Sequence, residues 1–401
     1  MYFASFILLA AVPAPVVQAT SLTTTHLDGG LIVPMILSKN QTAYMAQVSA
    51  GTPAQIEFLK VDTGSPTYSF LSSYNPVCSE ATKPCQTFGT FDNLTSSTSI
   101  YEGPGFSDRL GDYGTGDFLN DSVTIGGTKV DHMYFGYLNQ YGYPERAKPL
   151  TTTILGLSLS CAGVVANTTC NEDGPYILPQ LKKAKTINRM SASVYLGPDD
   201  LGVNNSELIF GGYMDKAKIG GPLISLPMVD PTTYLLSGGQ TNNVNVTSLE
   251  VVFNGNSTSG TYGEPDFGQP ALFDTGSVAT NLPSSIFYAI YGAFGGSSST
   301  YNRDLRYQNI DCKYRDPQNT KGALNIGFGA YGNVSIPLHR LVTPFDNGNC
   351  GMGTYPTSDG SVGIFGDDIL RSLYLIYDQE SFTLTLSEVK YTSEQNIVPF
   401  P

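Results

Sequence analysis

The chain has 401 residues and a formal net charge of −13, with 21 Lys and Arg against 34 Asp and Glu. A single hydrophobic core stops growing at about 250–300 residues, so we expect two lobes. The scarcity of basic residues disfavours nucleic acid or an anionic membrane surface as a partner, because both bind basic patches. Its 43 Gly and 25 Pro indicate frequent turns and a β-rich fold.

The N-terminus predicts export. Ile7–Val12 is a short apolar run, and Val17-Gln18-Ala19 is a plausible cleavage site, so we interpret residues 1–19 as a signal peptide. The run is too short to span a bilayer, and no apolar tail closes the chain, so no membrane anchor is expected.

The Cys and the Asn-x-Ser/Thr sequons also favour export, through an oxidising pathway that adds glycans. Pairing by proximity would join Cys78 to Cys85, Cys161 to Cys170 and Cys312 to Cys350, although six Cys allow many other connectivities. The Asn-x-Ser/Thr sequons begin at Asn40, Asn93, Asn120, Asn167, Asn204, Asn245, Asn256 and Asn333. We therefore expect a secreted glycoprotein, with the vacuole or another secretory compartment as the alternative.

The first half predicts strands separated by turns. Alternation indicates strands over Tyr44–Ala50 and Ile56–Val61, whereas the Ser-, Thr- and Gly-rich residues 92–107 predict a loop. Further expected elements are a hairpin around Gly126-Gly127, a short helix over Leu178–Ile187, and strands over Ser193–Leu196 and Glu207–Phe210.

We divide the rest of the chain into three parts. Residues 20–43 form an N-terminal segment that could serve as a short propiece, 44–220 a first lobe and 221–401 a second, because prolines punctuate the chain around residue 222. The second lobe should open with a loop-rich stretch that runs to Asp266. Beyond it we expect helices over Ile286–Phe294 and Ile369–Leu373, and strands over Ala323–Phe328, Val334–Leu338, Tyr374–Tyr377 and Phe382–Leu386.

Two other motifs are weak signals. Residues 327–332 match GxGxxG, but no helix follows them, so a hairpin turn is favoured over a dinucleotide site. The three His fall in no metalloprotease or nucleophile motif, and the Cys spacing fits no zinc pattern, so no metal is expected.

The strongest signal is a repeated triplet. Asp62-Thr63-Gly64 and Asp274-Thr275-Gly276 each follow a short apolar run and precede a Ser. One Asp-Thr-Gly is usually a turn, but two predict that each lobe brings one carboxylate to a shared centre. A second echo, Ile154-Leu155-Gly156 and Ile364-Phe365-Gly366, places in each half a Gly that would let another backbone approach closely.

With the stretch Asp112–Gly116 (DYGTG) between the triplets, the chain resembles the pepsin-like aspartic endopeptidases of fungal secreted type, from about Tyr44 to Leu386. The resemblance implies an all-β, bilobal double barrel with a few short helices and the active-site cleft between the lobes. It implies that Asp62 and Asp274 are catalytic.

The resemblance also assigns supporting roles. Thr63 and Thr275 would cross-link the two turns through their hydroxyls, and Ser65 and Ser277 would donate to the outer carboxylate oxygens. Gly64 and Gly276 leave room beside the carboxylates. Tyr113, Gly114 and Thr115 would form the tip of a mobile flap, and Ile154 would line the pocket beside the scissile bond.

The chemistry follows from the pair. Two carboxyls that share a proton are the known device of this family, with one charged and one neutral. The charged one takes a proton from water, and the neutral one donates to the scissile carbonyl. Polypeptides are the expected substrates, at acidic pH, and we expect a monomer that needs no metal or cofactor.

Departures from the family pattern keep alternatives open. Residues 20–38 hold no Lys or Arg, so inhibition by a basic propiece is not expected, and Ser69 stands where the family has a Trp that supports the flap. A bridge between Cys161 and Cys170 is not part of the pattern either. The alternatives are a catalytically silent pepsin-like binding or inhibitory protein and a carbohydrate-binding β-protein, which would not explain the duplicated triplet.

Overall fold

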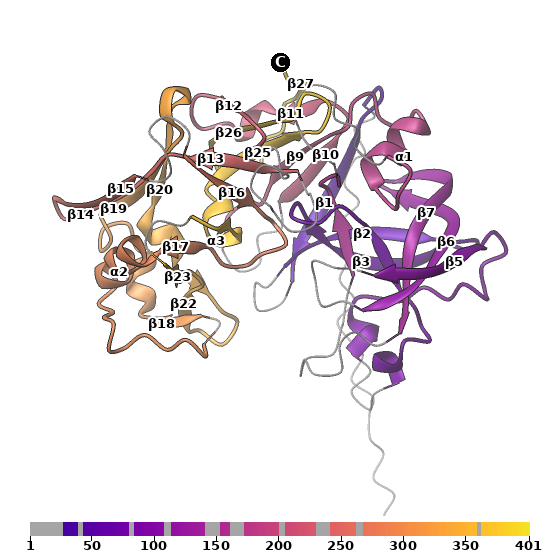
Figure 1. Ribbon diagram of the computed structural model, residues 1–401, viewed down its shortest axis with the longest axis horizontal. Helices are drawn as coiled ribbons and strands as arrows, with labels where there is room; N and C mark the ends of the chain where they lie inside the picture. Colours follow the sequence, from indigo (N-terminus) through magenta and orange to yellow (C-terminus); the bar gives the residue numbers. More distant parts are fainter. Residues whose placement is uncertain are drawn as a thin grey trace, which may run out of the picture.

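The computed structural model describes residues 27–38, 43–79, 84–107, 114–140, 153–160, 172–199, 205–229, 241–261, 268–305, 307–358 and 362–401. The predicted signal peptide, Tyr113, the pair Cys161 and Cys170, and three sequons (Asn40, Asn167 and Asn204) lie outside the described residues. The first half of the chain and the second half form two strand-rich bodies side by side (Figure 1). The all-β, bilobal expectation is confirmed, while the exact lobe boundaries remain a prediction.

One sheet of thirteen strands runs through both halves. Its strands from the first half are β1 (Leu31–Leu37), β2 (Tyr44–Ala50), β3 (Gln55–Asp62), β4 (Ser69–Leu71), β5 (Ile100–Ser107), β6 (Thr115–Ile125), β7 (Thr128–Gln140), β8 (Ile154–Gly156), β9 (Ser191–Tyr195) and β10 (Ser206–Phe210). The second half adds β12 (Ile224–Pro227), β25 (Leu373–Asp378) and β26 (Thr383–Glu388). Because β9 pairs antiparallel with β25, the two halves share one ladder of backbone hydrogen bonds.

Smaller sheets build the rest of the second half, on the left of Figure 1. Their strands are β13 (Asn243–Val246), β14 (Ser248–Phe253), β15 (Asn256–Thr261), β16 (Gln269–Phe273), β17 (Asn281–Pro283), β18 (Gln308–Ile310), β19 (Gly322–Gly327), β20 (Asn333–Pro337), β21 (Thr343–Pro344), β22 (Cys350–Met352), β23 (Tyr355–Thr357) and β24 (Ile364–Phe365). A two-stranded ribbon of β11 (Tyr213–Asp215) and β27 (Ile397–Pro399) lies near the C-terminus.

The helices are short. The α-helices are α1 (Ile177–Lys183), α2 (Ser284–Ala293) and α3 (Asp367–Leu370). Each overlaps a segment predicted to be helical and begins one or two residues before it. The apolar face of α2 is buried through Ile286, Phe287 and Ile290, as its spacing predicts. Within the described ranges, no helix combines the length and apolarity that crossing a membrane requires.

Two predicted loops are wrong. Residues 100–107, inside the predicted loop 92–107, form β5, which pairs with β6 through two register shifts. Most side chains of β5 are exposed, so pairing with β6 rather than a hydrophobic pattern makes this segment a strand. Likewise, the stretch predicted to be loop-rich contains β13, β14 and β15, and every residue of β15 is paired although its side chains are mostly exposed.

Strand β1 lies in the segment that we interpreted as N-terminal to the first lobe. It pairs with β10 and β2, and Val33 and Met35 are each only 1% exposed. This part of residues 20–43 therefore contributes to the core of the large sheet.

Several turns match their sequence signals. The hairpin of β6 and β7 turns at Gly126 and Gly127, both with positive φ. The GxGxxG stretch joins β19 to β20 through a single turn of 3-10 helix, as a hairpin. Two of the three predicted disulfides are present, Cys78–Cys85 and Cys312–Cys350, and the third pair lies outside the described residues.

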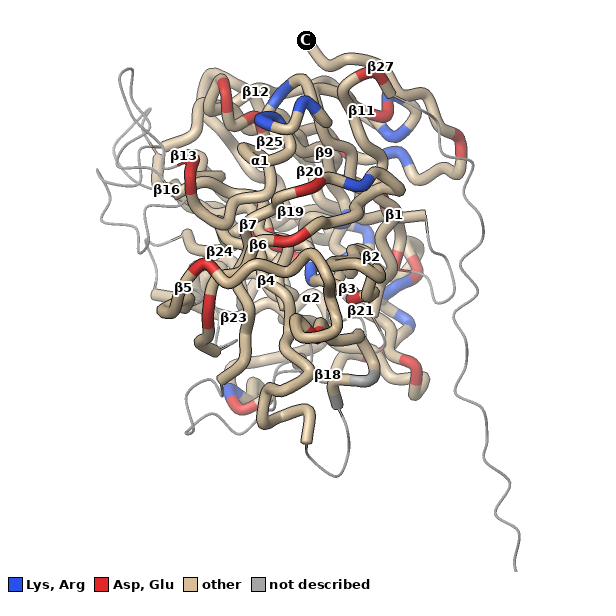
Figure 2. The backbone as a smooth tube through the Cα atoms, turned by 90° about the vertical axis from the view of Figure 1, so that its right-hand side faces the viewer, with Lys and Arg blue, Asp and Glu red and all other residues tan. Residues whose placement is uncertain are grey.

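Charge is spread thinly over the molecule. In Figure 2, Lys and Arg occupy short segments scattered among Asp and Glu, and the described residues show no continuous basic face in that view. Some charged groups are buried instead, among them Asp62 and Asp274 of the two Asp-Thr-Gly turns.

Candidate active site

The two Asp-Thr-Gly turns are supported in the same way. Strand β3 ends at Asp62 and pairs in parallel with β8, and β16 ends just before Asp274 and pairs in parallel with β24. Both triplets are nearly buried, with Asp62 6% and Asp274 9% exposed. Each half thus presents one carboxylate at the end of a strand that lies inside a sheet.

A Gly in each half, Gly156 and Gly366, makes this support possible. A Cβ on Gly156 would lie 2.6 Å from the carbonyl oxygen of Ser65, and a Cβ on Gly366 would lie 2.6 Å from that of Ser277. Only Gly leaves space for each turn to fold back onto the neighbouring strand. The predicted close backbone approach is confirmed in both halves.

Threonine hydroxyls join the two turns. The Thr63 N–H donates to Thr275 Oγ1 (3.2 Å), and the Thr275 N–H donates to Thr63 Oγ1 (3.0 Å). Each hydroxyl then donates to a carbonyl of the opposite strand, Thr63 to Phe273 (2.8 Å) and Thr275 to Val61 (2.9 Å). The expected cross-link is therefore present, and it is symmetrical.

Glycine N–H groups bring the carboxyls together. The Gly64 N–H donates to Oδ1 of Asp62 (2.9 Å) and to Oδ1 of Asp274 (3.0 Å). The Gly276 N–H donates to Oδ1 of Asp274 (2.7 Å). A Cβ would lie 2.6 Å from Asp274 Cγ on Gly64 and 2.3 Å from Asp62 Cγ on Gly276, so no larger residue fits either position.

The serines differ between the turns. Ser65 Oγ donates to Asp62 Oδ2 (3.0 Å), as expected. Ser277 Oγ donates to the Ala279 carbonyl (3.0 Å), so the expected bond from Ser277 to Asp274 is not found among the described residues. The second turn places its hydroxyl on its own backbone, and the outer oxygen of Asp274 lacks the partner that Asp62 has.

Comparison with known proteins agrees with this geometry. The family model "Eukaryotic aspartyl protease" matches residues 43–389. The chain belongs to the eukaryotic aspartyl protease family. As a member of this family, the protein is an aspartic-type endopeptidase that acts on polypeptides.

Relatives with curated names are fungal. Aspartic proteinase yapsin-3 of Saccharomyces cerevisiae is 25% identical over 90% of this chain and 69% of its own length. A probable aspartic-type endopeptidase, opsB, of Aspergillus oryzae is 28% identical over 90% of this chain and 71% of its own length. Secreted aspartic protease 1 of Candida albicans is 26% identical over 91% of this chain and 86% of its own length.

Burial and a neighbouring charge shift the pKa of one carboxyl group of the pair. Burial raises the pKa of Asp274 well above its ordinary value, and the negative charge of Asp62 raises it further. The carboxyl pair therefore retains one proton at a pH where an isolated aspartic acid would be ionised.

Buried polar residues that the sequence did not single out support the first turn. Asn242 Nδ2 donates to the Thr63 carbonyl (2.7 Å), and Gln379 Nε2 donates to Asn242 Oδ1 (2.7 Å). Tyr377 Oη donates to the Phe273 carbonyl (2.9 Å) beneath the second strand. These residues lie far from Asp62 in sequence and in no motif, so only the fold brings them to the site.

Residues expected at the flap are partly described. Strands β5 and β6 pair up to Ser107 opposite Thr115, and Tyr113 lies outside the described residues. Gly114 has φ of +115°, and Thr115 Oγ1 donates to Gln140 Oε1 (3.1 Å). A Cβ on Gly116 would lie 1.9 Å from the Tyr137 carbonyl oxygen, so the hairpin packs tightly on β7.

Two other expected residues are core residues. Ile154 has no exposed surface, so in this structure its side chain packs in the interior rather than lining an open pocket. Ser69 is also fully buried, between Tyr68 and Phe70, and these two rings join Phe135 in an aromatic cluster.

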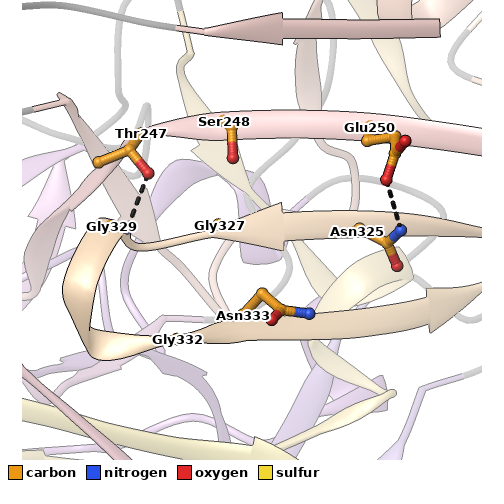
Figure 3. Close-up of a pocket in the computed structure, with 8 residues that line it drawn as sticks. All are labelled: Thr247, Ser248, Glu250, Asn325, Gly327, Gly329, Gly332 and Asn333. Atoms are coloured by element: carbon orange, nitrogen blue, oxygen red, sulfur yellow. Dashed lines mark hydrogen bonds between the residues drawn. The ribbon is translucent and has the colours of Figure 1, made fainter. Parts of the chain in front are cut away.

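A polar hollow lies elsewhere in the second half. It is lined by Thr247, Ser248, Glu250, Asn325, Gly327, Gly329, Gly332 and Asn333, on the turn between β19 and β20 (Figure 3). Thr247 accepts from the Gly329 N–H, and Glu250 accepts from Asn325. None of its lining residues belongs to the Asp-Thr-Gly turns.

Proposed function

We propose that Asp62 and Asp274 are the catalytic pair with which this aspartic endopeptidase hydrolyses peptide bonds. The observation that carries the proposal is the single Gly64 N–H that donates to both inner carboxylate oxygens. This donor holds the two carboxyl groups side by side, so that a water molecule can face the outer oxygen of each.

The raised pKa of Asp274 supports the division of labour. In the acidic range, the pair carries one proton and one negative charge, and the titration belongs to the pair rather than to either residue. The charged carboxyl removes a proton from the water, which attacks the scissile carbonyl carbon. The neutral carboxyl donates to the carbonyl oxygen, and the proton then passes to the leaving nitrogen.

The surroundings of the pair would bind an extended peptide. The hairpin of β5 and β6, with Tyr113, Gly114 and Thr115 at its end, would close over the substrate as a flap and exclude water. Ile154 would act from beneath the first turn by holding Lys60 and β3 in register rather than by touching the substrate.

Secretion is the location that we propose for the protein. Two disulfides, Cys78–Cys85 and Cys312–Cys350, are present, and the predicted signal peptide and sequons fit the same route. One relative carries "secreted" in its name. Expression in a secreting host, followed by N-terminal sequencing and glycosidase treatment of the product, would test the cleavage site and the sequons.

Activity of single variants tests the catalytic assignment. The wild-type protein should cleave a denatured polypeptide at about pH 3–5, and Asp62→Asn and Asp274→Asn should each lose about 10³-fold or more in kcat/KM. Asp304→Asn, at an exposed position, is the matched control and should retain full activity. A folded wild-type protein without cleavage across this range would support the silent binding protein instead.

A further inference from the structure

Lys60 is a buried cation at the carboxyl pair that no motif includes. It lies two residues before Asp62 on β3, so strand alternation places both side chains on the same face. Its side chain is only 11% exposed, and its Nζ lies 3.9 Å from Asp62 Oδ2. An ammonium group that is this buried requires compensation by nearby oxygens.

Lys60 also reaches across the molecule to the second turn. Its Nζ donates to the carbonyl of Gly276 (2.9 Å), which belongs to the other Asp-Thr-Gly triplet. The threonine cross-link joins the two turns through hydroxyls, whereas this bond joins them through a charge. Lys60 therefore fixes the position of Gly276, whose N–H holds Asp274 Oδ1.

Several titratable groups face the Lys60 ammonium. They are Asp62 on its own strand, Asp274 after β16, and Asp367 on α3, and the positive charge of Lys60 lowers the pKa of both Asp274 and Asp367. Nearby charged or ionisable groups of the packed elements are Arg371 from α3, Tyr377 from β25 and Tyr44 from β2, which accepts from Arg371.

The other half of the molecule shows what happens without this cation. The residue two positions before Asp274 is Leu272, which is 8% exposed and pairs with Ile364 just as Lys60 pairs with Ile154. An apolar residue is thus compatible with the backbone at this position of the repeat. The lysine is not required by the strand, so its presence calls for a reason in the chemistry of the site.

We propose that Lys60 is a positioning residue that sets the working pH range of the carboxyl pair and locks the second turn against the first. The proposal rests on the catalytic role of Asp62 and Asp274. A cation beside the pair stabilises each ionised form relative to the protonated one. The pair therefore loses its first and its second proton at lower pH than it would with an apolar residue at position 60.

The pH profile of kcat/KM tests this role. In Lys60→Leu, which installs the residue found in the other half, both limbs of the profile should move to higher pH by about one unit. Lys60→Arg retains the charge and should retain the wild-type limbs. Lys60→Gln retains a donor for Gly276 without the charge and should move the limbs as Lys60→Leu does.

The carboxyl titration gives a second readout that needs no activity. Protein labelled with ¹³C at the Asp side-chain carboxyl carbons should show the pair titrating at higher pH in Lys60→Leu, with Asp62→Asn and Asp274→Asn providing the assignments. Folded Lys60→Leu whose limbs and carboxyl titration coincide with those of the wild type would overturn the proposal. So would failure of both neutral variants to fold while Lys60→Arg folds, because Lys60 would then serve stability alone.

The two hypotheses fail in different ways. The catalytic assignment is wrong if activity survives in Asp62→Asn or Asp274→Asn. The Lys60 proposal is wrong if the limbs of the pH profile stay unchanged in Lys60→Leu while the enzyme still depends on both aspartates.

Discussion

The two Asp-Thr-Gly turns share a backbone and differ in their charges. Both are supported by a parallel strand and a close Gly, and both exchange the same hydrogen bonds through Thr63 and Thr275. Around this repeat, however, the first half places Lys60 where the second has Leu272, and the second half places Asp367 where the first has Leu157. The repeat therefore carries a cation in the first half and an extra acid in the second, and the two interact electrostatically.

This difference shows that the positions of the two carboxyl groups and their protonation have separate causes. The duplicated backbone fixes where the two carboxyls lie, and a symmetrical arrangement alone would give them equal environments. Ser65 and Lys60 both contact Asp62 Oδ2, whereas Ser277 turns away from Asp274. Because burial and the negative charge of Asp62 raise the pKa of Asp274, the asymmetry favours a state in which the shared proton lies on the side of Asp274.

The largest effect should come from breaking the shared geometry. Gly276→Ala would place a Cβ 2.3 Å from Asp62 Cγ and should lower kcat/KM by about 10²-fold or more, since small displacements of reacting groups are costly. Gly292→Ala, where the added Cβ has nothing within 4 Å, should leave steady-state activity unchanged. Equal activity of the two variants would refute the tight contact.

Asp367→Leu gives the second half the residue of the first, and it should alter stability against pH. Burial raises the pKa of Asp367 to about 8, so the folded state keeps a proton that the unfolded chain releases near 3.8. Stability therefore falls as the pH rises from about 4 to about 8, and the variant should recover about 3 kcal/mol or less at the upper end. Urea unfolding at pH 4 and pH 7 measures the difference.

Two neighbours sharpen this measurement. Part of the slope should remain in the variant, because burial also raises the pKa of Glu207 to about 8. Asp368→Leu should instead destabilise at both pH values, since Asp368 accepts from the hydroxyls of Thr280 and Thr354. A steeper pH dependence in Asp367→Leu than in the wild type would contradict the sign.

The threonine cross-link should show symmetry. Thr63→Val and Thr275→Val each leave one buried N–H without its acceptor and remove one donor to a strand carbonyl, so each should lower the free energy of unfolding by about 1–3 kcal/mol. Thermal unfolding of both variants, with the exposed Thr258→Val as control, measures this. A large difference between the two would show that the turns are not equivalent in packing.

The smallest effect should distinguish the serines. Ser65→Ala removes a donor to Asp62 Oδ2, so kcat/KM on the acidic limb should fall several-fold. In Ser277→Ala the lost bond goes to the Ala279 carbonyl, and the acidic limb should not move. Equal shifts in the two pH profiles would mean that Ser277 turns toward Asp274 during catalysis.

Much of the site could be predicted from sequence because its signals are local. The triplets and the later Gly are short motifs, each half has both, and together they predicted the close backbone approaches at Gly156 and Gly366. Lys60 was equally visible as a charge in the apolar run before Asp62, and strand alternation would have placed it beside that carboxylate.

Other features could not be predicted because their causes are not local. Asn242 and Gln379 reach the first turn only after the two halves have assembled. Strands β5 and β15 have exposed side chains without alternation, and their partners β6 and β14 create them. The hydroxyl of Ser277 had two acceptors within reach, and the motif alone does not choose between them.

The place of β25 in the large sheet bears on when the enzyme becomes active. Thr63 Oγ1 donates to Tyr377 Oη (3.4 Å), and Tyr377 Oη donates to the Phe273 carbonyl (2.9 Å), so one side chain of β25 contacts the first turn and the strand that leads to the second. A ribosome synthesises this strand after both triplets. While the nascent chain is still shorter than β25, both triplets have been made, but neither this contact nor the pairing of β25 with β9 can form. Proteolytic competence should therefore arise in one step once β25 is in place, rather than grow with chain length.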